Sequence, residues 1–135
     1  MKKCGKSCPV CPFVNEGKFI KKTNKNWEIY GKYNCETKNI IYIIECNKEK
    51  CKLRYIGETE KSLKDRIYNH ITKIKSIIPT TATGEHFNEP GHNLSNMTAT
   101  IIEQVKYNDI NYRRERKKYF IKKFNTLHKG LNRQL

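Results

Sequence analysis

The chain has 135 residues, which suits one domain with a modest core, and no apolar run approaches the roughly 18 residues that a membrane-spanning helix needs. Its 28 Lys and Arg against 13 Asp and Glu leave a net charge of +15, spread along the whole length. This balance predicts an anionic partner, for which nucleic acid is a better candidate than a membrane surface; the alternative is a solvated Lys-rich surface.

Cysteine and proline are concentrated at the start of the chain. Residues 1–6 are basic without a following hydrophobic stretch, so they are not expected to act as a secretory signal, and a reducing compartment is predicted. Six cysteines could form three disulfides in a secreted protein, but with histidines nearby metal binding is the better interpretation. The polar stretch around Trp27 predicts short strands or loops rather than a helix.

Two adjacent apolar segments predict a β-hairpin. Residues 39–46 are nearly continuous in β-branched and aromatic side chains, as expected of a central strand that is buried on both faces. After a charged turn at 47–50, residues 52–57 predict a second strand, and an antiparallel hairpin is the simplest connection. Tyr42 and Tyr55 then come from neighbouring strands.

The next segment predicts a helix with a defined start. Ser62 followed by Asp65 resembles a capping box, and an apolar stripe continues toward a stop at Pro79. The stripe consists of Leu63, Ile67, Ile71, Ile74 and Ile78. At about 100° per residue, Arg66 and His70 lie together on one flank of this stripe, at the edge of the core.

The rest of the chain predicts a loop, a third strand and a second helix. Residues 81–96 contain Gly, Pro and Asn turn signals and predict a long loop. Residues 98–105 alternate like a strand, and a helix is expected over about 111–124. Its inward residues are Phe120, Ile121 and Phe124.

Several motifs together resemble a known nuclease pattern. Tyr42, in the degenerate motif Ile40-Ile41-Tyr42, and Tyr55-Ile56-Gly57 on the next strand, followed by Arg66 and His70, are similar to the GIY-YIG pattern. Other segments resemble the endonuclease domain of Penelope-like retroelements: Gly57-Glu58-Thr59, 62–66, 85–87, 90–92, 125–128 and 130–132. The resemblance implies an α/β (α+β) fold, a three-stranded antiparallel sheet flanked by helices, that binds DNA and hydrolyses a phosphodiester.

The resemblance also implies roles for five residues. Tyr42 or Tyr55 would activate water, and a phenol with a pKa of about 10 needs nearby positive charge to do so. Arg66 would stabilise the transition state with its planar guanidinium, His70 would orient a tyrosine or relay a proton, and Asn132 would position the phosphate or active-site groups. The alternatives are core packing for the tyrosines, a surface salt bridge for Arg66 and a satisfied buried histidine.

One residue departs from the family pattern. The family carries a glutamate that holds a divalent cation, Mg or Mn, three residues before the aromatic that matches Phe120; here that position is Lys117. At about 100° per residue position 117 points inward, while Glu115 lies nearly opposite and cannot substitute. Lys117 therefore indicates an inactive domain, an engineered inactivation or an ammonium that replaces part of the metal's charge, and weakened cleavage is the favoured interpretation.

Two thiols and two imidazoles predict a structural zinc site. Cys46 and Cys51 flank the hairpin turn, and His86 and His92 bracket a later turn; tetrahedral zinc accepts this set. The Penelope-like pattern, with cysteines between the two nuclease motifs and histidines downstream, supports the grouping.

A second, all-cysteine zinc site is expected near the start of the chain. Its ligands are Cys4, Cys8, Cys11 and Cys35. It would clamp a Cys-rich extension, residues 1–38, to the nuclease domain, residues 39–135; the alternative is free thiols or a disulfide. Both sites would be closed and structural rather than water-activating.

Three functions compete at this point. The first is a DNA endonuclease that nicks DNA for a Penelope-like retroelement, which would act on nuclear DNA. The second, favoured by Lys117, is a non-catalytic, zinc-stabilised nucleic-acid-binding module. The third is an RNA-binding element, because basic residues are interleaved with Trp27, Tyr30 and Tyr33. No particular oligomeric state is predicted.

Overall fold

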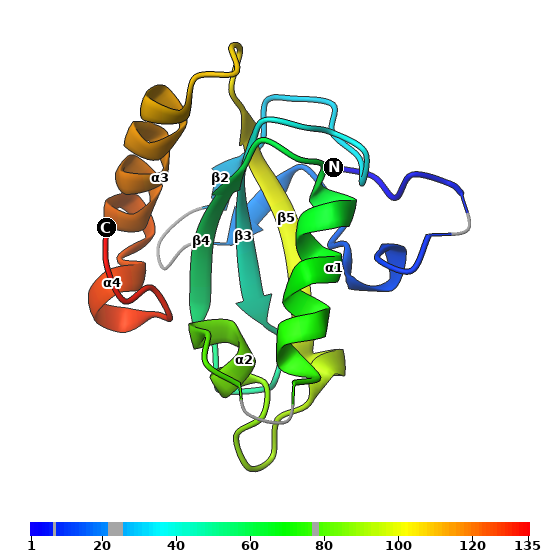
Figure 1. Ribbon diagram of the computed structural model, residues 1–135, viewed down its shortest axis with the longest axis vertical. Helices are drawn as coiled ribbons and strands as arrows, with labels where there is room; N and C mark the ends of the chain where they lie inside the picture. Colours follow the sequence, from blue (N-terminus) through cyan, green and yellow to red (C-terminus); the bar gives the residue numbers. More distant parts are fainter. Residues whose placement is uncertain (7, 22–25, 77–78) are drawn as a thin grey trace.

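The computed structural model describes residues 1–6, 8–21, 26–76 and 79–135 (Figure 1). At its centre is a three-stranded antiparallel sheet in the order β4-β3-β5. The strands are β3 (Ile40–Cys46), β4 (Arg54–Thr59) and β5 (Met97–Gln104). Helix α1 (Leu63–Ile74) packs on one face and helix α3 (Ile110–Phe124) on the other. The predicted mixed α/β fold is confirmed.

Strand β3 supplies both cores of the molecule. The side chains on the α1 face are Ile40, Tyr42 and Ile44, and those on the α3 face are Ile41 and Ile43. All five are fully buried, which explains why the segment is apolar without interruption. The register with β4 places Tyr42 opposite Gly57 and Ile44 opposite Tyr55, so the two tyrosines share the α1 face.

The two long helices begin at side-chain caps. Ser62 Oγ accepts a hydrogen bond from the Asp65 main-chain nitrogen at 3.1 Å, as the capping motif predicts. Helix α1 ends at Ile74, earlier than expected, and Ile78 lies outside the described residues. Helix α3 begins at an Asp109 cap. Within the described residues, no helix is long and apolar enough to cross a membrane.

The prediction of a long loop over 81–96 was wrong. This segment contains helix α2 (Ala82–His86) and a 3₁₀ turn (Leu94–Asn96). Five residues are too few to show a helical repeat in the sequence, and Thr81 provides the cap by accepting from the Gly84 nitrogen at 3.0 Å. The short helix α4 (Thr126–Lys129) was missed for the same reason.

The N-terminal segment lies against the same sheet. Val10 and Val14 are buried in the α1-side core, next to a 3₁₀ turn at Cys11–Phe13. The two-stranded sheet of β1 (Phe19–Lys21) and β2 (Asn26–Glu28) covers the α3-side core. Ring centroids of Trp27 and Phe120 are 5.6 Å apart in a T-shaped contact.

Candidate active site

Four of the five predicted catalytic residues meet on the α1 face of the sheet. Tyr42 comes from β3, Tyr55 from β4, and Arg66 and His70 from α1. The Tyr42 hydroxyl is 2.8 Å from His70 Nε2 and accepts a hydrogen bond from Arg66 Nε at 2.9 Å. The Tyr55 and His70 ring centroids are 5.7 Å apart.

Gly57 is required by the close approach of Tyr42. The tyrosine ring lies directly over Gly57 on the neighbouring strand, and a Cβ at position 57 would overlap the ring and its hydroxyl. The glycine of the Tyr-Ile-Gly motif therefore makes space for the aromatic residue of the other motif.

Burial decides the protonation of the Tyr42–His70 pair. It raises the pKa of Tyr42 above its ordinary value, and the positive charge of Arg66 offsets this only in part. Burial, together with the nearby Arg66 charge, lowers the pKa of His70 to about 3, so the imidazole is neutral at physiological pH. Tyr42 is fully buried, whereas Tyr55 is partly exposed and has access to solvent.

A groove of about 750 Å³ runs beside Arg66. It lies between α1, the end of β4 and the start of α3. Its charged lining is mixed, with Lys61, Arg66 and Arg113 against Glu58, Glu60 and Asp65. Tyr68 is 58% exposed, so an aromatic ring is available next to cationic side chains. The Tyr68 ring and the Arg66 guanidinium suit the bases and phosphates of a nucleic-acid strand, while the carboxylates of Glu60 and Asp65 oppose a phosphate in the same groove.

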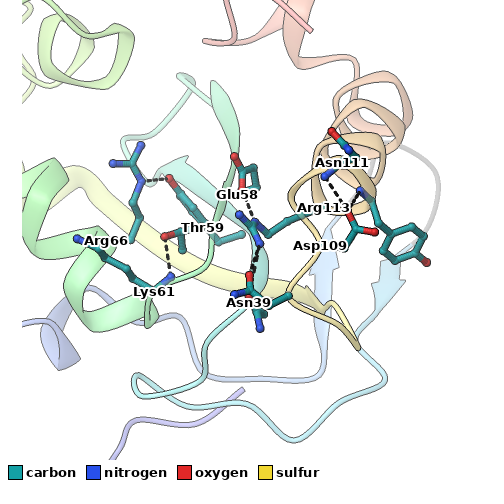
Figure 2. Close-up of polar contacts among 11 residues, drawn as sticks. Asn39, Glu58, Thr59, Lys61, Arg66, Asp109, Asn111 and Arg113 are labelled. Atoms are coloured by element: carbon teal, nitrogen blue, oxygen red, sulfur yellow. Dashed lines mark hydrogen bonds and ion pairs between the residues drawn. The ribbon is translucent and has the colours of Figure 1, made fainter.

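An ion pair missed by the sequence reasoning lies on the α3 side. Arg113 is 3% exposed, and its Nε is 2.5 Å from Glu58 Oε2. Figure 2 shows Arg113 reaching from α3 to Glu58 and Asn39, with Arg66 beyond them on α1. The available signal was spacing, since Arg113 lies one turn before Lys117 and Glu58 directly follows Tyr-Ile-Gly.

Lys117 points toward this ion pair. It is partly buried, and burial lowers the pKa of its ammonium; Glu58 opposes this shift, while Arg66 and Arg114 add to it. The Glu115 side chain is 70% exposed and lies 3.6 Å from Lys118, away from the core. Glu115 lines a surface hollow together with Glu58 and Lys117, but its side chain is solvent-exposed and pairs with Lys118.

The side chains around Lys117 do not fit a catalytic divalent cation. Magnesium needs carboxylate oxygens. Glu58 is neutralised by Arg113, and Lys117 adds a second positive charge beside it. A phosphate suits this excess of positive charge better than a metal ion.

Asn132 lies away from the tyrosines, at the outer edge of β4. Its Oδ1 accepts from the Ile56 nitrogen at 2.8 Å, and its Nδ2 donates to the Ile56 carbonyl at 2.9 Å. With Leu131, whose nitrogen donates to the Arg54 carbonyl at 2.8 Å, it covers the open strand edge. Both ends of its amide hold the strand between Tyr55 and Gly57, a geometry that suits positioning of active-site groups.

The predicted Cys/His set converges on one point. The ligand atoms of Cys46, Cys51, His86 and His92 lie within 4.8 Å of one another, and Cys51 Sγ is 3.4 Å from His86 Nε2. Both ring nitrogens of His92 are buried without a hydrogen-bond partner. Unpartnered buried nitrogens beside two thiols are what a metal ion satisfies, so these residues fit a tetrahedral structural site.

The four remaining cysteines also form a cluster. Cys11 Sγ is 3.5 Å from Cys4 Sγ and 3.6 Å from Cys35 Sγ. These separations exceed the disulfide length of about 2.05 Å and approach the spacing of about 3.8 Å between thiolates that share one tetrahedral zinc. Cys8 completes the set, and all four thiols are free. The cluster could hold a metal ion.

Comparison with known proteins identifies one family. Residues 38–132 match the model of the GIY-YIG catalytic domain. No curated protein and no solved structure matches the chain. The matched range runs from the start of β3 to Asn132, and leaves the cysteines at positions 4–35 outside it.

Proposed function

The chain belongs to the GIY-YIG catalytic domain family, which gives it a nuclease-type function on nucleic acid, and we propose that it is a DNA endonuclease whose cleavage is weakened by Lys117. DNA as the substrate and an origin in a Penelope-like retroelement, with action on nuclear DNA, are parts of this proposal. They are supported by the resemblance of the motifs from Gly57 to Asn132.

The observation that carries the proposal is the hydrogen-bonded set of Arg66, Tyr42 and His70. The Tyr42 hydroxyl joins the Arg66 guanidinium at 2.9 Å to the neutral His70 imidazole at 2.8 Å, and this preorganised polar group lies beside an open groove. Burying such a group costs stability unless each polar atom is hydrogen-bonded. Buried clusters of this kind with perturbed pKa values are typical of functional sites.

Phosphodiester hydrolysis requires a deprotonated water and stabilisation of charge on the transition state. We assign contact with the water to Tyr55, because it is the tyrosine that solvent reaches. Arg66 stabilises the phosphorane charge, since its guanidinium stays protonated and matches phosphate oxygens. Tyr42 and His70 hold Arg66 and Tyr55 in place, and Asn132 fixes the strand that carries Tyr55.

Lys117 supports weakened cleavage. The family's chemistry uses a divalent cation held by a glutamate at this position, and here an ammonium and the Glu58–Arg113 ion pair occupy that side of the site. The second candidate function, a zinc-stabilised binding module without catalysis, is favoured by the same observation. RNA binding remains the third.

A nicking assay on supercoiled plasmid, with and without magnesium, tests the proposal. We expect slow nicking that Arg66→Ala abolishes, and DNA binding that survives this substitution. If the protein binds DNA but does not nick it at any enzyme concentration, with or without magnesium, the result would support the binding module instead. Competition by RNA that displaces DNA at lower concentration would support the third function.

A further inference from the structure

Thr83 extends the polar set of the active site by one residue. It lies on α2 and is 1% exposed, and its Oγ1 is 3.0 Å from His70 Nδ1. A continuous chain of hydrogen bonds therefore runs from Arg66 through Tyr42 and His70 to Thr83.

The direction of these hydrogen bonds follows from the groups themselves. Arg66 can only donate, so the Tyr42 oxygen accepts from it. The Tyr42 proton then points to His70 Nε2, the acceptor within reach among the described residues. A neutral imidazole has one protonated nitrogen, which must be Nδ1, and Thr83 Oγ1 accepts that proton. Thr83 thus fixes the tautomer that lets Tyr42 donate to His70.

Thr83 shares its short helix with a member of the Cys/His cluster. Helix α2 has five residues, too few for stability on its own. Thr83 and His86 lie three residues apart on it, and the buried ring of His86 faces Cys51 at 3.4 Å. Other contacts also hold α2: Asn88 donates to the Ile74 and Gly84 carbonyls at 2.7 Å, Phe87 is buried in the α1-side core, and Glu85 forms an ion pair with Arg133. A metal ion that holds His86 would therefore add to the contacts that hold Thr83 in place.

We propose that Thr83 is a positioning residue of the nuclease site, which fixes the tautomer of His70 and couples it to metal binding at the Cys46/Cys51/His86/His92 cluster. The expected effect on cleavage rests on the proposed nuclease function. The tautomer itself is a property of the folded protein, whether or not the chain cleaves DNA.

Three matched substitutions test the role of the hydroxyl. Thr83→Val keeps the shape of the side chain and removes the acceptor, Thr83→Ser keeps the hydroxyl, and Thr100→Val makes the same change at a buried threonine whose hydroxyl has no partner. ¹⁵N NMR of the imidazoles identifies the protonated nitrogen of His70. We expect Nδ1–H in the parent, Thr83→Ser and Thr100→Val, and a mixture of tautomers or a shift to Nε2–H in Thr83→Val.

Cleavage kinetics measure the consequence. Loss of a residue that orients a functional side chain lowers activity by roughly tenfold to a hundredfold. We expect a fall of this size in kcat, with KM unchanged, for Thr83→Val alone. A tautomer that moves without any change in nicking would overturn the role in catalysis while leaving the hydrogen-bond assignment intact. Nicking that is absent from every variant, with the tautomer shift present, would count against the nuclease proposal and not against Thr83.

Metal removal tests the coupling. The zinc-loaded full chain is compared with the same chain after chelation, with circular dichroism to follow the fold. We expect the His70 Nδ1–H signal to be lost on chelation and restored when zinc is added back. A chelated protein that stays folded and keeps His70 in the Nδ1–H form would overturn the coupling, and an unchanged His70 tautomer in Thr83→Val would overturn the positioning role.

Discussion

The two sides of the sheet carry opposite halves of one site. On the α1 side, Tyr42, His70 and Thr83 are almost fully buried, and each polar atom meets a partner within about hydrogen-bond distance. On the α3 side, Lys117 is only partly buried and lies beside an ion pair that already neutralises Glu58. The first half is complete; the second does not fit the cation that the family's chemistry requires.

On the proposed function, the two sides of the sheet differ in how easily the fold accepts a change that weakens cleavage. Removing one partner from the α1 side would leave a buried polar group unsatisfied, which costs stability. The side chain at position 117 is partly exposed to solvent, so the fold can tolerate a substitution there. Function is therefore easiest to alter from α3, and the following predictions test this contrast.

The largest expected effect is that of metal removal. Zinc binding in small closed sites contributes apparent free energies on the order of 10 kcal/mol at neutral pH. We expect two zinc ions per chain by elemental analysis and a large fall in the unfolding temperature on chelation. Cys51→Ser should bind one ion fewer, and Glu49→Ser, an exposed change in the same turn, should bind both. A metal-free protein with an unchanged unfolding temperature would contradict this prediction.

Arg66→Ala comes next, with a loss of about a hundredfold or more in the nicking rate, as for removal of a group that stabilises transition-state charge. Arg114→Ala, an exposed change on α3, should alter nicking far less. Both variants are measured in the parent and in a Lys117→Glu background. If the two substitutions lowered the nicking rate equally, the α1 side would not contribute more to cleavage than the α3 side, and the contrast would be wrong.

The stability of the α1 side should depend on His70 and pH. Because burial lowers its folded-state pKa to about 3, unfolded His70 takes up a proton below about pH 6.5 while folded His70 does not. Its contribution is complete above pH 6.5 and is lost as the pH falls toward 3. Between pH 6.5 and 5 we expect the parent to lose about 2 kcal/mol more than His70→Gln in urea unfolding. Parallel pH dependences would show that His70 is not buried as a neutral residue.

Gly57→Ala should have an effect on stability similar in size to that of His70. The added Cβ displaces the Tyr42 ring, and overpacking of this kind costs about 1 to 3 kcal/mol. Measured by urea unfolding, the same substitution in a Tyr42→Leu background should cost much less, because the ring is absent. Similar costs in both backgrounds would mean that Tyr42 does not lie over Gly57.

The sequence predicts the sheet and the α1 side well. Apolar runs, alternation and capping are local signals, and they place the three strands, Ser62 as a cap, and Arg66 and His70 on one flank of α1. The grouping of Tyr42 with these two residues follows from the family pattern. Both groups of metal-ligating side chains follow from residue type and the family pattern, and each group converges in space.

The remaining features depend on contacts between distant segments. Helix α2 is too short to show a period, so Thr83 has no sequence signal of its own. The pairing of Arg113 with Glu58 joins residues 55 positions apart. The place of Asn132 on the edge of β4 depends on how the chain returns after α4. Apart from the one-turn spacing between Arg113 and Lys117, none of these features is visible in local sequence patterns.

Replacement of Lys117 tests the central contrast most directly. Nicking of supercoiled plasmid is followed over a magnesium titration for the parent, Lys117→Glu and Lys117→Gln. We expect Lys117→Glu to create or strongly raise magnesium-dependent nicking, and Lys117→Gln, which removes the charge without supplying a ligand, to leave it low. The account would be contradicted if the parent already cuts well with magnesium and the Lys117→Glu variant cuts no faster, because Lys117 would then not have replaced a metal-binding residue.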